Sequence, residues 1–313
     1  MLSTAPFEVP QYLLDRAKGL DRVPMAVAGA DNMVVMESAR QATDAGLIAP
    51  VLVGDRDEIE SLAETMGWDI SSFRIVETGE EDEAAAARMA VALARDGEVK
   101  ALMKGHVHTD ALMAAVVARE TGLRTGRRLS HVFHMTVPGS DRVLMITDGA
   151  VNIAPNENTL IDIVNNAVGL AHALGNANPK VAILSGTESA LPAMPSSMQA
   201  KVIVERARAG EVTGAIVDGP FAFDNAISPE AARLKGIDSP VAGNADILVV
   251  PNIETGNGLF KMMVYFMSGL AAGIVLGAKV PIVLTSRADP PEARFAATAI
   301  AAIAAAGGTN GPD

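Results

Sequence analysis

Short apolar runs alternate with helix-forming segments along most of this chain, and no other feature restricts the fold so strongly. Before residue 121 the runs lie at 25–28, 51–53, 74–76 and 101–103, and the helices predicted after them lie at 32–45, 57–66, 82–95 and 109–120. Strands that alternate with helices are typical of a parallel sheet covered by helices on both faces. The sequence therefore predicts an α/β protein.

The alternation is interrupted near residue 129. The runs 131–137 and 142–147 are both strand-like, and the Pro-Gly-Ser-Asp sequence between them predicts a turn, so the two runs are expected to pair antiparallel. The alternation then resumes, with strands predicted at 181–184, 215–217 and 247–250 and helices at 157–174, 197–209, 229–235 and 257–268. We therefore predict two α/β domains with a break near residue 129.

The segment 279–294, KVPIVLTSRADPPEAR, combines a buried strand, a polar turn and the start of a helix. Ser286 and Arg287 follow the strand at its carboxyl end, where open α/β sheets place their ligand sites. Asp289 is predicted to cap the Ala-rich helix, whose first turn suits the two prolines. A hydroxyl and a guanidinium beside a helix N-terminus favour an anion. A capping role for Ser286 and a surface ion pair for Arg287 also explain these residues.

The composition narrows the partners and the location. The formal net charge is -12, which argues against nucleic acid as a main partner because phosphate backbones need a basic surface. A small anionic ligand is still compatible, since a few Arg and Lys side chains make a local positive site. The chain has no Cys, which excludes disulfides and thiolate metal sites. Its first residues lack signal-peptide features, and its most apolar segment, 270–284, is too short to span a bilayer. We therefore expect a cytoplasmic protein without a membrane partner.

The polar loop after the fourth predicted strand is a candidate binding site. Lys104 is expected to hold a phosphate beside the helix that follows, and Thr109 is a second candidate for binding that phosphate. Thr109 or Asp110 is also expected to cap the helix. A solvated lysine next to ordinary capping residues is the alternative. His106 and His108 alternate as metal ligands on a strand do, but no third ligand is identifiable nearby in the sequence, so no metal site is predicted.

Further loops carry polar residues directly after predicted strands. The candidate substrate-binding residues in them are Asp148, Asn152, Asp218, Asn252, Gly256, Asn257 and Lys261. Glycine in such a loop lets a ligand approach the backbone closely, and amide groups near a helix start supply hydrogen bonds. Plain turns explain the Asp and Asn residues equally, and solvation explains the lysine, because these residue types are common in ordinary loops.

Taken together, these loops resemble those of the phosphate acetyl/butyryltransferase family. The matching strings, in order between about residues 100 and 290, are MKGHVHTDALMAAVV, GLRTGRRLSHVF, TDGAVNIAPNENTLIDIVNNAVGLAHALG, VDGPFAFDNAISPEAARLKGIDSPVAGNADILVVPNIETGN and GIVLGAKVPIVLTSRAD. The nearest likeness is to the phosphate-acyltransferase portion of proteins that also carry an N-terminal MaoC-like enoyl-CoA hydratase domain. Because this chain has no room for that domain, we expect a stand-alone or excised form.

The resemblance implies two three-layer α/β/α domains of the isocitrate/isopropylmalate dehydrogenase type, with a cleft between them and a homodimeric assembly. The implied domains are residues 1–129 with 282–313, and residues 130–281. The implied reaction is reversible: a short acyl-CoA, acetyl to butyryl, and phosphate give an acyl phosphate and CoA, without metal or other cofactor.

The resemblance also assigns roles around the polar turn. Phosphate is expected to attack the thioester directly within a ternary complex. Arg287 would bind phosphate and the carbonyl oxygen, where charge develops, and Ser286 would donate a hydrogen bond to the sulfur of the leaving CoA. In the reverse direction a carboxylate would act as general base on the thiol.

The sequence departs from the family pattern at two places. The acid expected seven residues after the serine is Ala293, so Glu292 or Asp289 is expected to replace it. The arginine that family members often carry in the helix after Lys104 is also missing, and Ala114 stands at about that place. A CoA-binding paralogue without turnover is therefore one alternative. A metal- and NAD-dependent dehydrogenase on the same fold is another, although its metal ligands do not assemble from the sequence.

Overall fold

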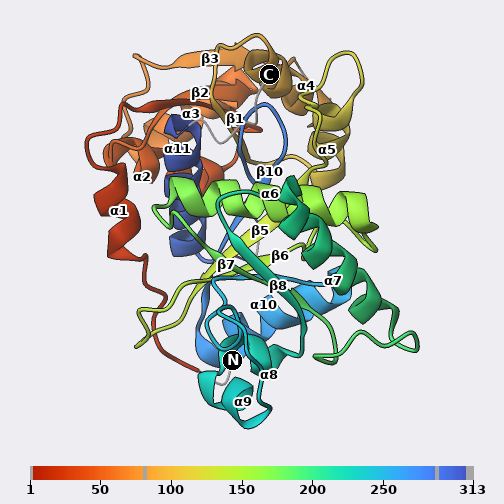
Figure 1. Cartoon of the computed structure of the whole chain (residues 1–313). Helices are drawn as coiled ribbons and strands as arrows, with labels where there is room; N and C mark the ends of the chain where they lie inside the picture. Colours follow the sequence, from red (N-terminus) through yellow and green to blue (C-terminus); the bar gives the residue numbers. More distant parts are fainter. Residues whose placement is uncertain (1–2, 80–82, 286–288, 308–313) are drawn as a thin grey trace. The chain divides into compact units, whose positions relative to one another are not determined.

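The chain, seen here in a computed structural model that describes residues 3–79, 83–285 and 289–307, forms two compact units. Unit I comprises Val9–Arg127 with Ala272–Asp313, and unit II comprises Met1–Glu8 with Arg128–Ala271. Strands and helices alternate in both units (Figure 1), which confirms the predicted α/β class. The finer domain boundaries and the cleft that the family resemblance implies stay predictions.

Unit I is built on a largely parallel sheet. Its strands follow the order β3-β2-β1-β4-β11-β10, with bounds Arg74–Glu77, Ile48–Gly54, Val23–Ala28, Ala101–Lys104, Ile282–Val283 and Leu270–Leu276. Neighbours pair in parallel from β3 to β11, whereas β10 is antiparallel to β11. The register pairs Ala28 with Lys104 and Val283 with Met103, so β1, β4 and β11 end at the same edge of the sheet.

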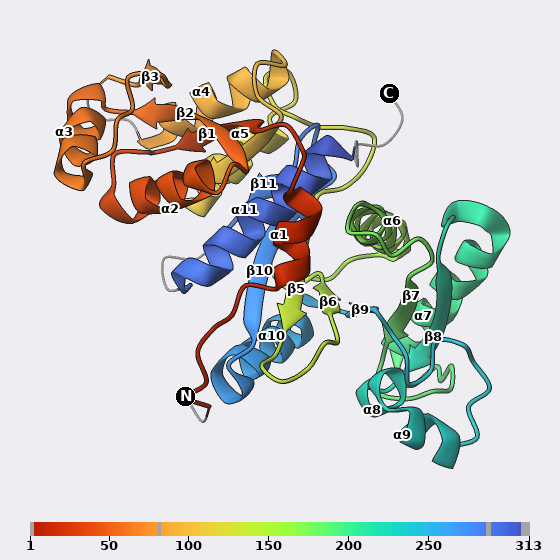
Figure 2. The ribbon, with the colours of Figure 1, turned by 90° about the vertical axis from the view of Figure 1, so that its left-hand side faces the viewer.

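Helices cover both faces of this sheet. They are α1 Gln11–Ala17, α2 Met33–Asp44, α3 Arg56–Met66, α4 Glu83–Arg95, α5 Thr109–Val117 and α11 Pro291–Ala306. Helices α2 and α4 lie on opposite faces of β1 and β2 (Figure 2), α5 packs on α4, and α11 packs against both α1 and α2. Most residues of α11 from Ala293 to Ala304 are buried, because its small alanine side chains let neighbouring elements approach on several sides.

The strands of unit II follow the order β5-β6-β9-β7-β8. The bounds are Ser130–Thr136, Leu144–Thr147, Ile247–Val249, Lys180–Leu184 and Ile216–Phe221. Strands β5 and β6 pair antiparallel, which confirms the pair predicted around the Pro-Gly-Ser-Asp turn, and the remaining neighbours are parallel. Strands β6 and β9 therefore end at the same edge of the sheet, with Thr147 beside Val249.

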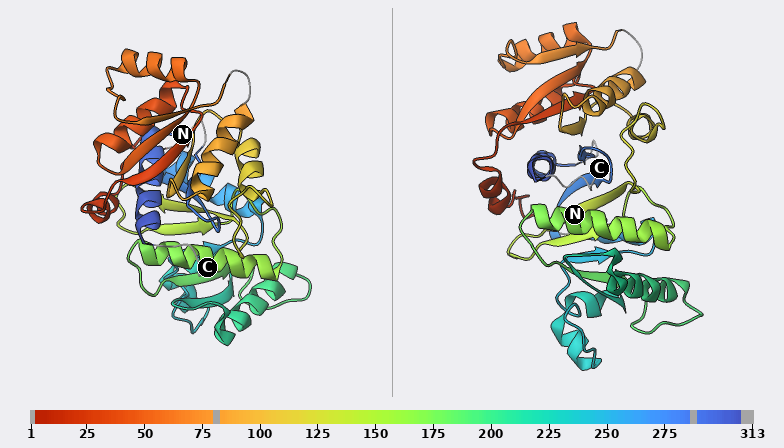
Figure 3. Two further views of the ribbon diagram at one scale, coloured as in Figure 1. Left: turned by 90° about the horizontal axis from the view of Figure 1, so that it is seen from above. Right: turned by 45° about the horizontal axis from the view of Figure 1, so that its top comes forward.

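The helices of unit II pack on this sheet around an apolar core. They are α6 Glu157–Ala173, α7 Pro195–Arg206 with a π-helical turn η1 Ala207–Glu211, α8 Phe223–Ile227, α9 Pro229–Leu234 and α10 Ile253–Met267. Helix α6, light green in Figure 3, contacts β5, β6 and β9, and α10 contacts β6. Of the helices that the structure describes in either unit, none has the length and apolar character to cross a membrane.

Two predicted helix caps are wrong. The N-cap of α5 is His108 rather than Thr109 or Asp110, and no side chain caps that helix. The N-cap of α11 is Pro290, so Asp289 lies one residue before the cap. An Asp or Thr near a helix start was therefore an insufficient signal for the capping residue.

Helix α10 begins earlier than the sequence pattern predicts. Its N-cap is Asn252, whose Oδ1 accepts hydrogen bonds from the Thr255 N–H at 2.9 Å and from the Thr255 hydroxyl at 2.6 Å. An Asn side chain in this position satisfies a backbone donor that the first helical turn leaves without an intrahelical partner. Residues 253–256, expected as a loop, are therefore helical.

His134 is a buried titratable group in β5. Its side chain is 1% exposed, and burial lowers its pKa from 6.5 to about 4, because desolvation disfavours the imidazolium. In the unfolded chain the same group protonates near its ordinary pKa, so between these two pH values the unfolded state binds more protons than the folded state. The contribution of the neutral His134 to folding stability is therefore fully present above about pH 6.5, and it is lost as the pH falls toward about 4.

Lowering the pH from about 7 to about 5 is expected to reduce the free energy of unfolding by about 2 kcal/mol through His134 alone. Urea unfolding at the two pH values measures the change. The variant His134→Gln should lose this part of the pH dependence, whereas His106→Gln, at an exposed histidine, should keep it. An unchanged dependence in His134→Gln would contradict a neutral, buried imidazole.

Candidate functional site

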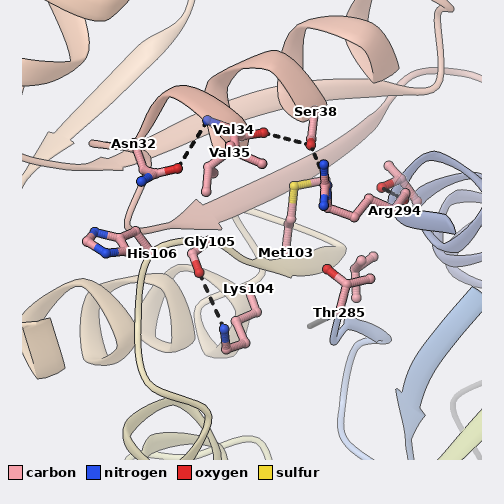
Figure 4. Close-up of a pocket in the computed structure, with 12 residues that line it drawn as sticks. Asn32, Val34, Val35, Ser38, Met103, Lys104, Gly105, His106, Thr285 and Arg294 are labelled. Atoms are coloured by element: carbon pink, nitrogen blue, oxygen red, sulfur yellow. Dashed lines mark hydrogen bonds between the residues drawn. The ribbon is translucent and has the colours of Figure 1, made fainter. Parts of the chain in front are cut away.

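Unit I contains a cavity of about 200 Å³ at the edge where β4 and β11 end. Residues from four segments line it: the start of α2 between Asn32 and Ser38, the end of β4 from Met103 to His106, Val283 and Thr285 at β11, and Arg294 and Thr298 of α11 (Figure 4). The cavity thus lies at the carboxyl ends of parallel strands, where α/β proteins place ligand sites.

The loops after β1 and β4 are held together by their backbones at this cavity. The N–H of Gly105 donates to the carbonyl of Ala28 at 2.9 Å, and the N–H of His106 donates to that of Gly29 at 2.8 Å. A Cβ atom on Gly105 would lie 2.4 Å from the Gly29 carbonyl oxygen, so only glycine fits there. Helix α2 then starts at a defined place, because the Asn32 side chain accepts a hydrogen bond from the Val34 N–H at 3.1 Å.

Two cationic side chains lie on the cavity. Lys104 is half-buried at the end of β4, with Nζ 3.5 Å from the Gly105 carbonyl oxygen. Arg294 donates from Nε to the Ser38 hydroxyl at 3.1 Å and from its Nη1 to the Asp289 carbonyl at 2.6 Å. Among the described residues of the cavity wall there is no acidic side chain, so the local charge favours an anion.

Arg294 is a site residue that the sequence-based prediction missed. It sits in a helix whose other residues are almost all apolar, and a single cation in an Ala-rich helix was the available signal. Its partner Ser38 is 256 positions away in sequence, so the contact itself leaves no local pattern.

The predicted catalytic residues Ser286 and Arg287 lie outside the described residues. They directly follow Thr285, which lines the cavity. Glu292 lies half-buried in the first turn of α11, and Asp289 lies just before that helix, yet neither belongs to the described cavity wall. The two carboxylates proposed as general bases therefore lie in the sequence between Thr285 and Arg294, which line the cavity, but they do not line it themselves.

Lys104 is brought into the cavity, but Thr109, predicted to act with it, is not. Thr109 is exposed at the first position of α5 and does not line the cavity. Across the described ranges, no group of three or more His, Asp or Glu side chains is arranged to hold a metal ion.

A second polar cluster lies in unit II, in the loop after β6. Asp148 is 2% exposed, and its carboxylate accepts hydrogen bonds from the N–H groups of Ala150 and Val151, both at 2.9 Å. It also accepts from Asn152, through the backbone N–H at 3.2 Å and through Nδ2 at 2.7 Å. Asn152 Nδ2 donates as well to the Leu129 carbonyl at 2.8 Å. Asp148 and Asn152 thus fix the shape of the loop.

The start of α10 packs directly on this loop. A Cβ atom on Gly256 would lie 2.8 Å from the Gly149 Cα and 2.9 Å from the Asp148 carbonyl oxygen. Asn257 Nδ2 donates to the Gly149 carbonyl at 3.4 Å. The close approach that Gly256 was predicted to offer a ligand is therefore taken up by the neighbouring backbone. The structure thus brings together most of the unit II candidates: Asp148, Asn152, Asn252, Gly256 and Asn257.

The other two unit II candidates lie apart from this contact network. Asp218, in β8, accepts a hydrogen bond from the Arg208 guanidinium at 3.1 Å. Lys261 is exposed on α10, with Nζ 6.0 Å from the centre of the Phe260 ring. Arg208 and Lys261 are exposed, and contacts made by exposed charged side chains contribute little to stability.

Comparison with known proteins places this geometry in a family. Residues 82–302 match the family described as phosphate acetyl/butaryl transferase. The chain is 50% identical over 268 residues to a phosphate acetyltransferase of Rhizobium meliloti, covering 86% of this chain and 84% of that protein. It is 42% identical over 293 residues to a phosphate butyryltransferase of Clostridium acetobutylicum, covering 94% and 97% of the two chains.

Solved structures give the same answer for the fold. A branched-chain phosphotransacylase from Enterococcus faecalis V583 superposes with a TM-score of 0.78 at 34% identity, covering 90% of this chain and 99% of that one. A 4-hydroxythreonine-4-phosphate dehydrogenase from Klebsiella pneumoniae, at 14% identity and a TM-score of 0.56 over 91% of this chain and 99% of that one, shares the fold alone. The chain belongs to the phosphate acetyl/butyryltransferase family.

Proposed function

We propose that this protein transfers a short acyl group reversibly between CoA and inorganic phosphate, in the cytoplasm. One phosphate oxygen forms a bond to the thioester carbonyl carbon, the carbon–sulfur bond breaks, and CoA leaves as the thiolate. Family membership and the names of the relatives support the reaction class. The observation that carries the proposal is the cavity with a cationic edge at the end of β4 and β11, next in sequence to Ser286 and Arg287.

The proposed roles follow from the charges that the reaction develops. Arg287 binds phosphate and the carbonyl oxygen, on which negative charge grows during attack, and Ser286 donates a hydrogen bond to the leaving sulfur. Lys104 adds positive charge at the cavity edge, where phosphate is expected to enter. Glu292 or Asp289 accepts the thiol proton in the reverse reaction, in which the CoA thiolate attacks the acyl phosphate. CoA and phosphate are substrates, and the proposed chemistry uses no metal or other cofactor.

The release of free CoA thiol from acetyl-CoA and butyryl-CoA, with and without phosphate, tests this function. The chain has no Cys, so a thiol reagent reports CoA alone. Release that depends on phosphate and persists in EDTA is expected. Release that is independent of phosphate, or no release with any acyl-CoA alongside tight CoA binding, would contradict the proposed function.

We also propose that two copies of the chain associate through α10. Met262, Tyr265 and Phe266 are 44%, 50% and 55% exposed, and their spacing places them on one face of this helix. A contiguous apolar patch on a protein surface marks an interaction site, and a helix face can pair with its own copy across a two-fold axis. The family resemblance favours a second copy as the partner.

Phe266→Glu is expected to convert the dimer into a 32.4 kDa monomer, because the interface would then bury two unpaired carboxylates. Size-exclusion chromatography with light scattering measures the mass. Leu234→Glu is the matched control: Leu234 is 71% exposed on α9 in the same unit, and that variant should stay dimeric. A monomeric wild-type chain at micromolar concentration would contradict the assembly.

A further inference from the structure

The cavity of unit I has an apolar wall that the proposed phosphate chemistry leaves unused. Its floor is formed by Met103, Val283 and Thr298, which are 4%, 1% and 1% exposed. Val34 and Val35 of α2 form the side. Val34 is 45% exposed although it is a large apolar residue, so an apolar ligand in the cavity would cover it.

The two cationic side chains of the cavity make hydrogen bonds to neighbouring groups beside this wall. The Arg294 side chain extends toward Ser38 and Lys104 extends toward Gly105 (Figure 4), and each makes its hydrogen bond there. Arg294 therefore presents its apolar stem to the cavity while two of its nitrogens are bound. The space between these cations is bordered by methyl and thioether groups.

The size of the cavity fits more than an acetyl group. Apolar cavities of about 150 Å³ hold a six-carbon ring, and this one measures about 200 Å³. A single methyl group would leave most of the wall without contacts, and atoms that face an empty space lose their dispersion attraction. A chain of about four to six carbons would fill the volume.

Building on the proposed function, we propose that this cavity binds the acyl chain of the acyl-CoA, and that Val34 and Val35 limit its length. Thr285 lies in the same wall and directly precedes in the sequence Ser286, to which we assign the hydrogen bond to the leaving sulfur. Met103 is unbranched and flexible, and it can adjust to straight or branched chains. The preferred substrates are therefore butyryl and similar acyl groups.

Phosphate-dependent kcat/KM values for acetyl-CoA and butyryl-CoA test the proposal. The wild-type enzyme should favour butyryl-CoA at least about tenfold, since each methylene in an apolar pocket changes kcat/KM by about 10–200-fold. Val34→Phe narrows the cavity and should lower the butyryl-to-acetyl ratio by at least about tenfold. Val34 is half-exposed near the start of α2, and Phe has a helix propensity close to that of Val, so the variant should fold.

Val117→Phe is the matched control. Val117 has the same exposure of 45%, lies on α5 in the same unit, and is not among the residues that line the cavity. That variant should keep the wild-type ratio. Val35→Ala removes two methyl groups from the wall and should raise the rate with hexanoyl-CoA relative to butyryl-CoA severalfold, an effect in the opposite direction.

The outcomes separate this proposal from the function on which it rests. If the wild-type enzyme releases no CoA in a phosphate-dependent way with any acyl-CoA, the proposed function is wrong. If it is active but prefers acetyl-CoA, or if Val34→Phe and Val117→Phe have equal acyl-chain ratios, the function stands and the acyl pocket is elsewhere. A change in the KM for phosphate without a change in the acyl ratio would make the cavity a phosphate site instead, and would overturn the proposal.

Discussion

Arg287→Ala is expected to lower kcat for acyl transfer by about 10³-fold or more and to leave the melting temperature nearly unchanged. Removing a single donor to a developing oxyanion typically costs about 10²–10³ in kcat. Arg287 is assigned two such tasks, since it would bind the attacking phosphate and the carbonyl oxygen together. A guanidinium can hold both with charge-assisted, directional hydrogen bonds, which strengthen as charge moves onto the oxygens.

Two further variants sharpen this experiment. Arg287→Lys keeps the positive charge but loses the planar fork of donors, so its rate should fall between those of the wild type and the alanine variant. Arg208→Ala removes an exposed arginine that pairs with Asp218 in unit II, and it should retain the wild-type rate. Steady-state kinetics with saturating phosphate and butyryl-CoA separates the three. A wild-type rate for Arg287→Ala would remove this residue from the active site.

The order of elements was predictable because burial imposes a period on the sequence. Strands β1, β2, β4 and β7 lie where short apolar runs predicted them, and β5 and β6 pair around the turn that the Pro-Gly-Ser-Asp sequence predicted. Each of these features depends on neighbours in sequence. A local hydrophobic pattern is sufficient to predict a strand or a turn when the residues that form the pattern are the ones that form the element.

The contacts that shape the candidate sites were less predictable because they depend on distant residues. Asn252 was identified as a polar loop residue, yet only the structure shows that its side chain caps α10 and makes residues 253–256 helical. Arg294 at the cavity donates a hydrogen bond to Ser38, and no local sequence pattern predicts a contact between residues so far apart in the chain. The apolar wall of the cavity combines residues of α2, β4 and α11, which no single stretch of the sequence brings together.

Gly105 illustrates such a long-range constraint, and Gly105→Ala is expected to reduce the free energy of unfolding by about 3 kcal/mol. A Cβ atom there would lie 2.4 Å from the Gly29 carbonyl oxygen and 2.6 Å from that of Ala28. Both are backbone atoms at the end of β1, so relief requires the loops after β1 and β4 to separate. That movement would weaken the hydrogen bonds of the Gly105 and His106 N–H groups and displace Lys104 from the cavity.

Urea unfolding measures the loss, with Gly126→Ala as the control in the same unit. A Cβ atom on Gly126 meets nothing within 4 Å, so that substitution should change stability by less than about 1 kcal/mol. A third variant identifies the cause. The Val35 Cγ1 atom would lie 2.8 Å from the added carbon, so Gly105→Ala combined with Val35→Ala removes that side-chain contact and leaves the two carbonyl contacts. The double variant should therefore remain as unstable as Gly105→Ala, and recovery of stability would show that α2, rather than the end of β1, sets the constraint.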